Sequence, residues 1–148
     1  MNLHRPSQPF LALVDDDSHS ARLMIRMLLA HGAPSVSWMQ DAGAGLTEIG
    51  TTLDDDAAAL PGLVIVDLKS TSRATVEFIE TLRGLEHGGS LQIAAMASTL
   101  ERQTREGLLA AGADAVFERH GNIDLYRREA AAIVSFWVRN QRLDAVGT

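Results

Sequence analysis

Cysteine is absent from this sequence of 148 residues. Its absence excludes disulfide bonds, zinc sites built from thiolates and catalysis by a thiol. Long apolar runs are missing too, because no stretch reaches the roughly 18 consecutive apolar residues of a membrane span. Residues 1–6 also lack the apolar segment of a signal peptide. We therefore expect a cytoplasmic protein with no segment in a membrane.

Basic residues are few: 13 Lys and Arg stand against 19 Asp and Glu, and the net charge is −6. Contacts to phosphate groups dominate the affinity for nucleic acids, so this acidic chain without a Lys/Arg cluster is not expected to bind them directly. No linker rich in Pro, Gly or Ser divides the chain, and 46% of the residues are apolar. We expect one globular domain over residues 1–148.

Short apolar runs alternate with longer stretches of helical spacing. The predicted strands are residues 10–14, 36–39, 63–66, 91–96 and 115–117. The first predicted helix begins at Asp17 or Ser18 and ends near residue 31. The other predicted helices cover about 42–52, 73–85, 100–111 and 123–141. Strands that alternate with helices in this way predict an α/β fold, in which a parallel sheet has helices on both faces as three layers, α-β-α.

Two of the predicted strands end in carboxylates. Asp15 and Asp16 follow the first strand, and Asp67 follows the third. In open parallel sheets the functional crevice lies beyond the carboxyl ends of the strands, so these side chains would converge if the strands are neighbours. Their mutual repulsion favours a bound cation, and Mg²⁺ prefers such oxygen ligands. We interpret Asp17 as the cap of the following helix rather than as a ligand.

The sequence resembles the receiver domain of bacterial response regulators over residues 10–141. The segments that carry the resemblance are Leu-Ala-Leu-Val-Asp-Asp-Asp at 11–17, Leu-Val-Ile-Val-Asp-Leu at 63–68 and Ala-Ala-Gly-Ala-Asp at 110–114. The resemblance implies the flavodoxin-like receiver fold, with a five-stranded sheet of order 2-1-3-4-5. It also implies a role in two-component phosphorelay signalling, with a histidine kinase or phosphotransfer protein as partner. Such a domain is not an enzyme in the usual sense.

The resemblance assigns roles to individual residues of the crevice. It implies Asp67 as the phosphoacceptor, and Asp15 and Asp16 as the acidic pair that holds Mg²⁺. Asp67 itself and the backbone carbonyl of Lys69 would be further metal ligands. Arg119 stands at the position of the family's Lys and would contact the phosphoryl group as a cation. The side chain of Lys69 is expected to point to solvent, although its ammonium could neutralise part of the acidic pocket if it folds back.

Other positions of the switch depart from the family's pattern. The Thr or Ser at the end of the fourth strand is replaced by Ala97, which has no hydroxyl. Ser98 is adjacent, but a shift of one residue turns a strand side chain to the opposite face unless a bulge intervenes. The aromatic position of the fifth strand falls at Val116, with Phe117 on the other face. These departures leave open a pseudo-receiver that acts as a phosphorylation-independent protein–protein interaction module.

The last predicted helix is apolar almost all round between residues 130 and 138. A helix packed on one face of a sheet should show a single apolar stripe. We therefore expect a homodimer or partner contact through this helix, with Tyr126, Val134, Phe136 and Val138 as candidates, unless the helix simply lies deeper in the core. A small Mg²⁺-dependent phosphotransferase or hydrolase is a third reading, which the absence of a Gly-rich phosphate loop disfavours.

Overall fold

A computed structural model describes residues 9–147, with side chains for residues 9–141. Five strands and five α-helices alternate along the chain, and a short 3₁₀-helix, η1, precedes β4. The elements are β1 (Leu11–Asp15), α1 (Ser18–Ala30), β2 (Val36–Met39), α2 (Ala42–Leu53), β3 (Leu63–Asp67), α3 (Ala74–Gly84), η1 (Gly88–Ser90), β4 (Ile93–Ala97), α4 (Arg102–Ala111), β5 (Ala115–Glu118) and α5 (Ile123–Gly147). The predicted alternation of strands and helices is confirmed.

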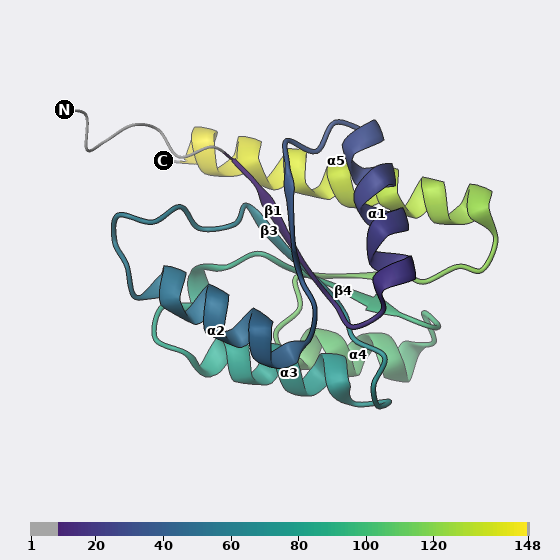
Figure 1. Ribbon diagram of the computed structural model, residues 1–148, viewed down its shortest axis with the longest axis horizontal. Helices are drawn as coiled ribbons and strands as arrows, with labels where there is room; N and C mark the ends of the chain where they lie inside the picture. The colour runs from purple at the N-terminus through teal and green to yellow at the C-terminus, as the bar shows by residue number, and fades with distance from the viewer. Residues whose placement is uncertain (1–8, 148) are drawn as a thin grey trace.

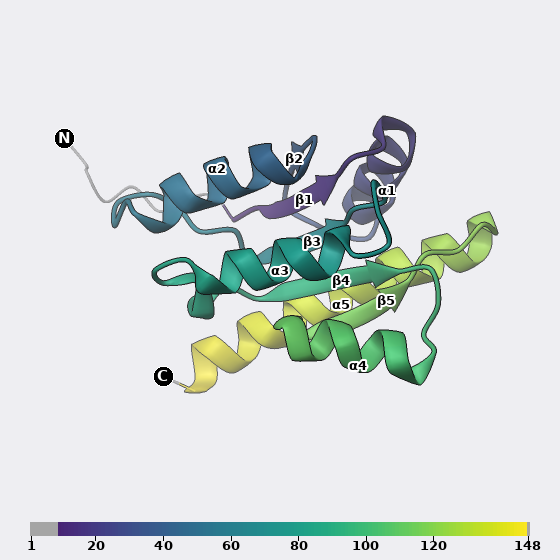
Figure 2. The ribbon, with the colours of Figure 1, turned by 90° about the horizontal axis from the view of Figure 1, so that it is seen from below.

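All five strands are parallel and form one sheet of order β2-β1-β3-β4-β5, as expected. Helices α1 and α5 cover one face, and α2, α3 and α4 cover the other (Figure 1). Figure 2 shows the strands side by side, in the order β2, β1, β3, β4, β5 from top to bottom. The central strands β1, β3 and β4 are buried at every residue, which explains why their sequences are continuous apolar runs rather than alternating ones.

The helix boundaries follow local signals in the sequence. Asp17 caps α1, since its carboxylate accepts a hydrogen bond from the His19 amide at 3.0 Å, and Asp41 caps α2 through the Ala44 amide at 2.7 Å. Gly32 follows α1 with φ of +102°, a conformation that favours glycine. The expected end of the last helix near residue 141 is wrong, because α5 continues to Gly147. Residues 123–146 contain no Gly or Pro that would end the helix earlier.

Arg83, near the end of α3, joins the α3–β4 and α4–β5 connections at the end of the sheet opposite the crevice. Its guanidinium donates to the carbonyls of Gly88 at 2.9 Å, Leu91 at 2.8 Å and Gly112 at 2.8 and 3.0 Å. It also pairs with the Asp114 carboxylate at 2.9 Å, and that carboxylate accepts the amide at the start of β4. Arg83 therefore cross-links the ends of α3 and α4 with the entrance to β4.

Candidate functional site

The acidic residues at the ends of β1 and β3 lie side by side. Asp15 and Asp67 are partners in the parallel register of the two strands, and their exposed fractions are 0% and 2%. The strands are neighbours because the chain reverses its winding direction after β2, which is the usual position of a functional crevice in this type of sheet. The predicted convergence of the two carboxylates is therefore what the topology produces.

Lys69 supplies a cation between these two carboxylates. Its Nζ lies 2.7 Å from Asp15 Oδ1 and 3.2 Å from Asp67 Oδ2, and it donates to the Asp67 carbonyl at 3.0 Å. The expectation that this side chain points to solvent is wrong, and only 24% of it is exposed. Two buried carboxylates repel each other strongly, and the ammonium that lies nearest to them in the sequence relieves that repulsion.

Asp16 lies beside the pair but makes different contacts. Its carboxylate accepts the backbone amides of Lys69, at 3.0 and 3.1 Å, and Ser70, at 2.9 Å. Asp16 thus fixes the start of the connection between β3 and α3. Because the amide of Lys69 faces Asp16, this contact is what brings the Lys69 backbone to the crevice. The proposed role of the Lys69 carbonyl as a metal ligand stays a prediction.

Arg119 follows β5 and contacts Asp67 from the other side. Its Nε and Nη2 lie 2.8 and 2.7 Å from Asp67 Oδ1. The backbone amide of Arg119 donates to the Ala97 carbonyl at 2.7 Å, so the pairing of β4 with β5 extends to this residue and aims its side chain at the crevice. The Asp67 carboxylate therefore has Arg119 on one oxygen and Lys69 on the other.

Asp15 is held by several further donors. It accepts hydrogen bonds from the Ser20 hydroxyl at 2.8 Å and the Asp17 amide at 2.9 Å, and its backbone carbonyl accepts Nε1 of Trp38 at 2.9 Å. Burial nevertheless raises the pKa of Asp15, and the hydrogen bond from Lys69 is the largest influence in the opposite direction. The crevice thus contains three carboxylates and two cations.

A divalent ion, which the fold family implies, does not fit this arrangement of side chains. Asp15 and Asp67 are bridged by the Lys69 ammonium, and both oxygens of Asp16 accept backbone amides. In the part of the chain that the structure describes, no group of three His, Asp or Glu side chains could hold a metal ion. The oxygen donors are present, but the chain's own donors already use them.

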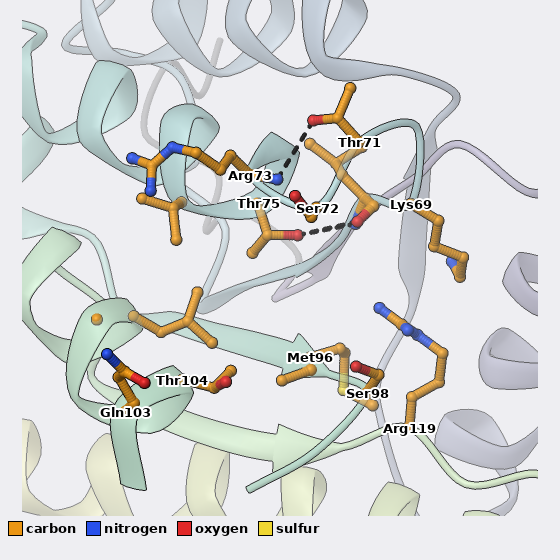
Figure 3. A pocket seen from close by; sticks show the side chains of 15 residues that line it. Lys69, Thr71, Ser72, Arg73, Thr75, Met96, Ser98, Gln103, Thr104 and Arg119 are labelled. Atoms are coloured by element: carbon orange, nitrogen blue, oxygen red, sulfur yellow. Dashed lines mark hydrogen bonds between the residues drawn. The ribbon is translucent and has the colours of Figure 1, made fainter. Parts of the chain in front are cut away.

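A cavity of about 550 Å³ opens next to Asp67, between the β3–α3 connection and α4. Figure 3 shows Lys69, Arg119 and Ser98 at one end, with Thr104 and Gln103 further along. Ala97 lies in its wall, is 6% exposed and offers no hydroxyl. Ser98 is exposed at the cavity and follows the last residue of β4, whose pairing with β5 is regular to its end. The hydroxyl that the resemblance implies is therefore missing from the strand position.

The two faces of β5 are as the sequence predicts. Val116 packs against the cluster beneath α2, α3 and α4, whereas Phe117 faces α5 and stacks edge-on against Phe136 with ring centroids 6.1 Å apart. The β5 side chain on the face of α2, α3 and α4 is therefore the short, branched Val116 and not an aromatic one.

The interface expected on the last helix is partly wrong. Tyr126 and Val134 are 4% and 6% exposed and belong to the core beneath α1 and α5, so they cannot contact a partner. Phe136 and Val138 are partly buried and pack against the same core. Helix α5 is apolar on more than one face because it packs on the sheet and on α1 at the same time.

Sequence reasoning missed one contact of the site and gave a second one only as the alternative to a solvent-facing side chain. The Thr75 hydroxyl, in the first turn of α3, is buried and bonds to the amide and carbonyl of Leu68, at 3.1 and 3.2 Å. It orients the residue between Asp67 and Lys69. The second is the ammonium of Lys69 itself. Its only signal in the sequence was a lysine two residues after an acidic strand end.

Comparison with solved structures identifies this fold as that of response-regulator receiver domains. The phosphorylated cyanobacterial phytochrome response regulator RcpA superposes with a TM-score of 0.70 at 15% identity, over 89% of this chain and 95% of that one. The Mn²⁺-bound response regulator Rcp1 gives 0.71 at 15%, over 87% and 94%, and a response regulator from Hahella chejuensis gives 0.71 at 18%, over 87% and 94%.

No protein-family model and no curated protein matches the sequence. The structural likeness establishes the receiver fold of this chain, as the resemblance in the sequence implied. No helix among the described residues is long and apolar enough to cross a membrane.

Proposed function

We propose that this chain is a receiver domain of a bacterial two-component pathway, in which Asp67 accepts a phosphoryl group from a histidine kinase or a phosphotransfer protein. The observation that carries the proposal is the environment of the Asp67 carboxylate. It ends β3 in the crevice, adjoins Asp15 in the register, and meets the Arg119 guanidinium at 2.7 Å. Signalling of this kind would occur in the cytoplasm.

The chemistry follows from the contacts of Asp67. Arg119 binds Oδ1 through two nitrogens, so Oδ2 is the oxygen that would attack the donor's phosphorus. The bond from phosphorus to the donor nitrogen breaks, an acyl phosphate forms on Asp67, and the departing imidazole takes a proton from solvent. Phosphoryl transfer depends mainly on positioning and on stabilising charge on the phosphoryl oxygens. Lys69 and Arg119 are the cations that contact Asp67 and would stabilise this charge.

The chain modifies only itself in this reaction and would not be an enzyme in the usual sense. The fold and the crevice support such a role over a hydrolase or a phosphotransferase with its own substrate. A general acid or base paired with the crevice carboxylates would favour a hydrolase, but the ion pairs of His120 are with Glu118 and Glu129, both at 3.9 Å.

A second candidate is a pseudo-receiver that binds a partner protein without phosphorylation. Buried Ala97 favours it, because the missing hydroxyl removes a contact through which a phosphoryl group could alter β4. Val116 favours it too, since a short side chain packed against the core has little to rearrange. A switch requires a ligand that binds one state better than the other, and both replacements weaken that difference.

Intact-mass measurement after incubation with acetyl phosphate tests the first candidate. The wild type should gain one phosphoryl group, Asp67→Asn should gain none, and Asp124→Asn should behave as the wild type. Asp124 is a matched control because its side chain is 77% exposed and lies at the start of α5. If wild-type protein gains no mass from acetyl phosphate or from a phosphorylated histidine phosphotransfer protein, the first candidate is wrong and the pseudo-receiver replaces it.

A further inference from the structure

The ammonium of Lys69 lies between the two carboxylates that a divalent ion would bridge. We propose that Lys69 is the resident cation of the crevice, so that Lys69 and Arg119 together neutralise Asp15 and Asp67 without a metal ion and the site excludes divalent ions. The inference concerns the crevice of the proposed function. Its test measures metal binding alone, and it therefore stands or fails separately from phosphorylation of Asp67.

The Lys69 ammonium makes two hydrogen bonds and one further ion-pair contact in the crevice. A lysine ammonium carries three N–H groups and no acceptor. Three oxygens surround Nζ of Lys69: Asp15 Oδ1 at 2.7 Å, the Asp67 carbonyl at 3.0 Å and Asp67 Oδ2 at 3.2 Å. Two of these oxygens belong to carboxylates that are almost fully buried. This is the arrangement of a bound cation rather than of a surface ion pair.

The backbone of Lys69 is fixed independently of its side chain. Asp16 accepts the Lys69 amide at 3.0 Å, and Thr75 holds the preceding residue, Leu68, through two hydrogen bonds. The backbone therefore loses no further conformational entropy when the ammonium enters the crevice, and only the rotamers of the side chain have to be fixed. A cation tethered in this way competes at a high effective concentration with any ion from solution.

A divalent ion would have to break two sets of contacts. It would displace Lys69 from Asp15 and Asp67, and to recruit Asp16 it would also free that carboxylate from the amides of Lys69 and Ser70. Mg²⁺ additionally loses its own water reluctantly. If the ion entered beside Lys69 instead, the repulsion between the two cations would oppose it.

Isothermal titration calorimetry with MgCl₂ tests the proposal. The proteins compared are wild type, Lys69→Met and Arg73→Met. Arg73 is the matched control, because it lies on the same connection but its side chain is 64% exposed and pairs with Glu77, at 3.9 Å, which is equally exposed. Both substitutions change the net charge equally. We expect Lys69→Met to bind Mg²⁺ about tenfold or more tightly than wild type, since one unit of positive charge leaves the site. Arg73→Met should bind as wild type does.

Two outcomes would overturn the proposal. If wild type binds Mg²⁺ as tightly as Lys69→Met, the ammonium does not exclude the ion. If neither protein binds it, another feature, such as the position of Asp16, excludes it. Far-UV circular dichroism confirms that each variant is folded, and Lys69→Gln takes the place of Lys69→Met if the latter does not fold. Lys69→Arg keeps a cation and should bind Mg²⁺ as weakly as wild type.

Discussion

Replacing Lys69 by Met should destabilise the protein by about 2 to 3 kcal/mol at neutral pH. Removal of one partner from a buried ion pair costs roughly 3 to 5 kcal/mol, whereas exposed pairs contribute about 0 to 1 kcal/mol. Here the carboxylates are 0% and 2% exposed and the lysine is 24% exposed, so the pair belongs near the buried limit. Asp67 retains Arg119, and Asp15 retains the Ser20 hydroxyl, which moderates the loss.

Urea unfolding followed by circular dichroism gives the free energy of unfolding for wild type, Lys69→Met and Arg73→Met. Arg73→Met should stay close to wild type because its pair with Glu77 is exposed. A second series at lower pH provides an internal check. Burial raises the pKa of Asp15 and the Lys69 hydrogen bond opposes this, so removing Lys69 raises that pKa further. The variant then takes up a proton on Asp15, and its deficit should shrink as the pH falls.

Two results would refute this reasoning. One is a decrease in the free energy of unfolding for Lys69→Met that is no larger than the decrease for Arg73→Met. The ammonium would then contribute no more than an exposed surface charge does. The other is a deficit that is unchanged between neutral and acidic pH. That outcome would mean that the variant is weakened by lost packing rather than by an uncompensated carboxylate at Asp15.

Three further predictions concern stability and titration. Burial raises the pKa of Asp15 above 3.8, so the folded protein keeps this proton to higher pH than the unfolded chain does. The unfolding free energy of wild type, relative to that of Asp15→Asn, should therefore fall as the pH rises from 4 through the raised pKa. A series of urea titrations in which this difference does not change with pH would contradict the prediction. Burial also raises the pKa of Tyr126, the one tyrosine of the chain, far above 10.0. The ultraviolet absorbance of the Tyr126 phenolate should therefore appear only when the protein unfolds, and the free energy of unfolding should decline above pH 10. An ordinary tyrosine titration curve in the folded protein would refute the burial of Tyr126. Replacing Arg83 by Met removes its hydrogen bonds to three backbone carbonyls and to Asp114, and should cost about 3 kcal/mol in the same unfolding assay. Arg102→Met, with the side chain 90% exposed, is the control expected to be unchanged, and an equal response of the two variants would count against the role of Arg83.

Much of the fold could be predicted because the central strands and the helix caps carry strong local signals. Continuous apolar runs at β1, β3 and β4 identify strands buried on both faces, and Asp17 and Gly32 mark the two ends of α1. The limits of weaker elements could not be predicted as well. The end of α5 lacks a breaker, and the sequence between Gly88 and Ile93 contains a 3₁₀ turn that no periodicity indicates.

The candidate site could be predicted in its residues but not in its contacts. The acidic strand ends gave Asp15 and Asp67, and the resemblance to receiver domains added Arg119, which indeed binds Asp67. The direction of the Lys69 side chain depends on how the β3–α3 connection turns, and that turn is fixed by Asp16 and Thr75 from other parts of the chain. Such long-range contacts leave no trace in local sequence patterns.

The same limit explains the interpretation of α5. An apolar surface all round a helix indicates burial on more than one side, but it does not say what the second partner is. Here that partner is α1 of the same chain, which packs on α5 and shares with it the core cluster that includes Tyr126 and Val134. Intrachain packing and an intermolecular interface give the same sequence pattern, and only the arrangement of the helices distinguishes them.

The most direct test of this account is a crystal structure grown in MnCl₂, with anomalous diffraction data that locate the metal. The account predicts no anomalous peak between Asp15 and Asp67, with Nζ of Lys69 within hydrogen-bond distance of both carboxylates as it is here. A Mn²⁺ peak coordinated by Asp15 and Asp67, with Lys69 turned away to solvent, would contradict it.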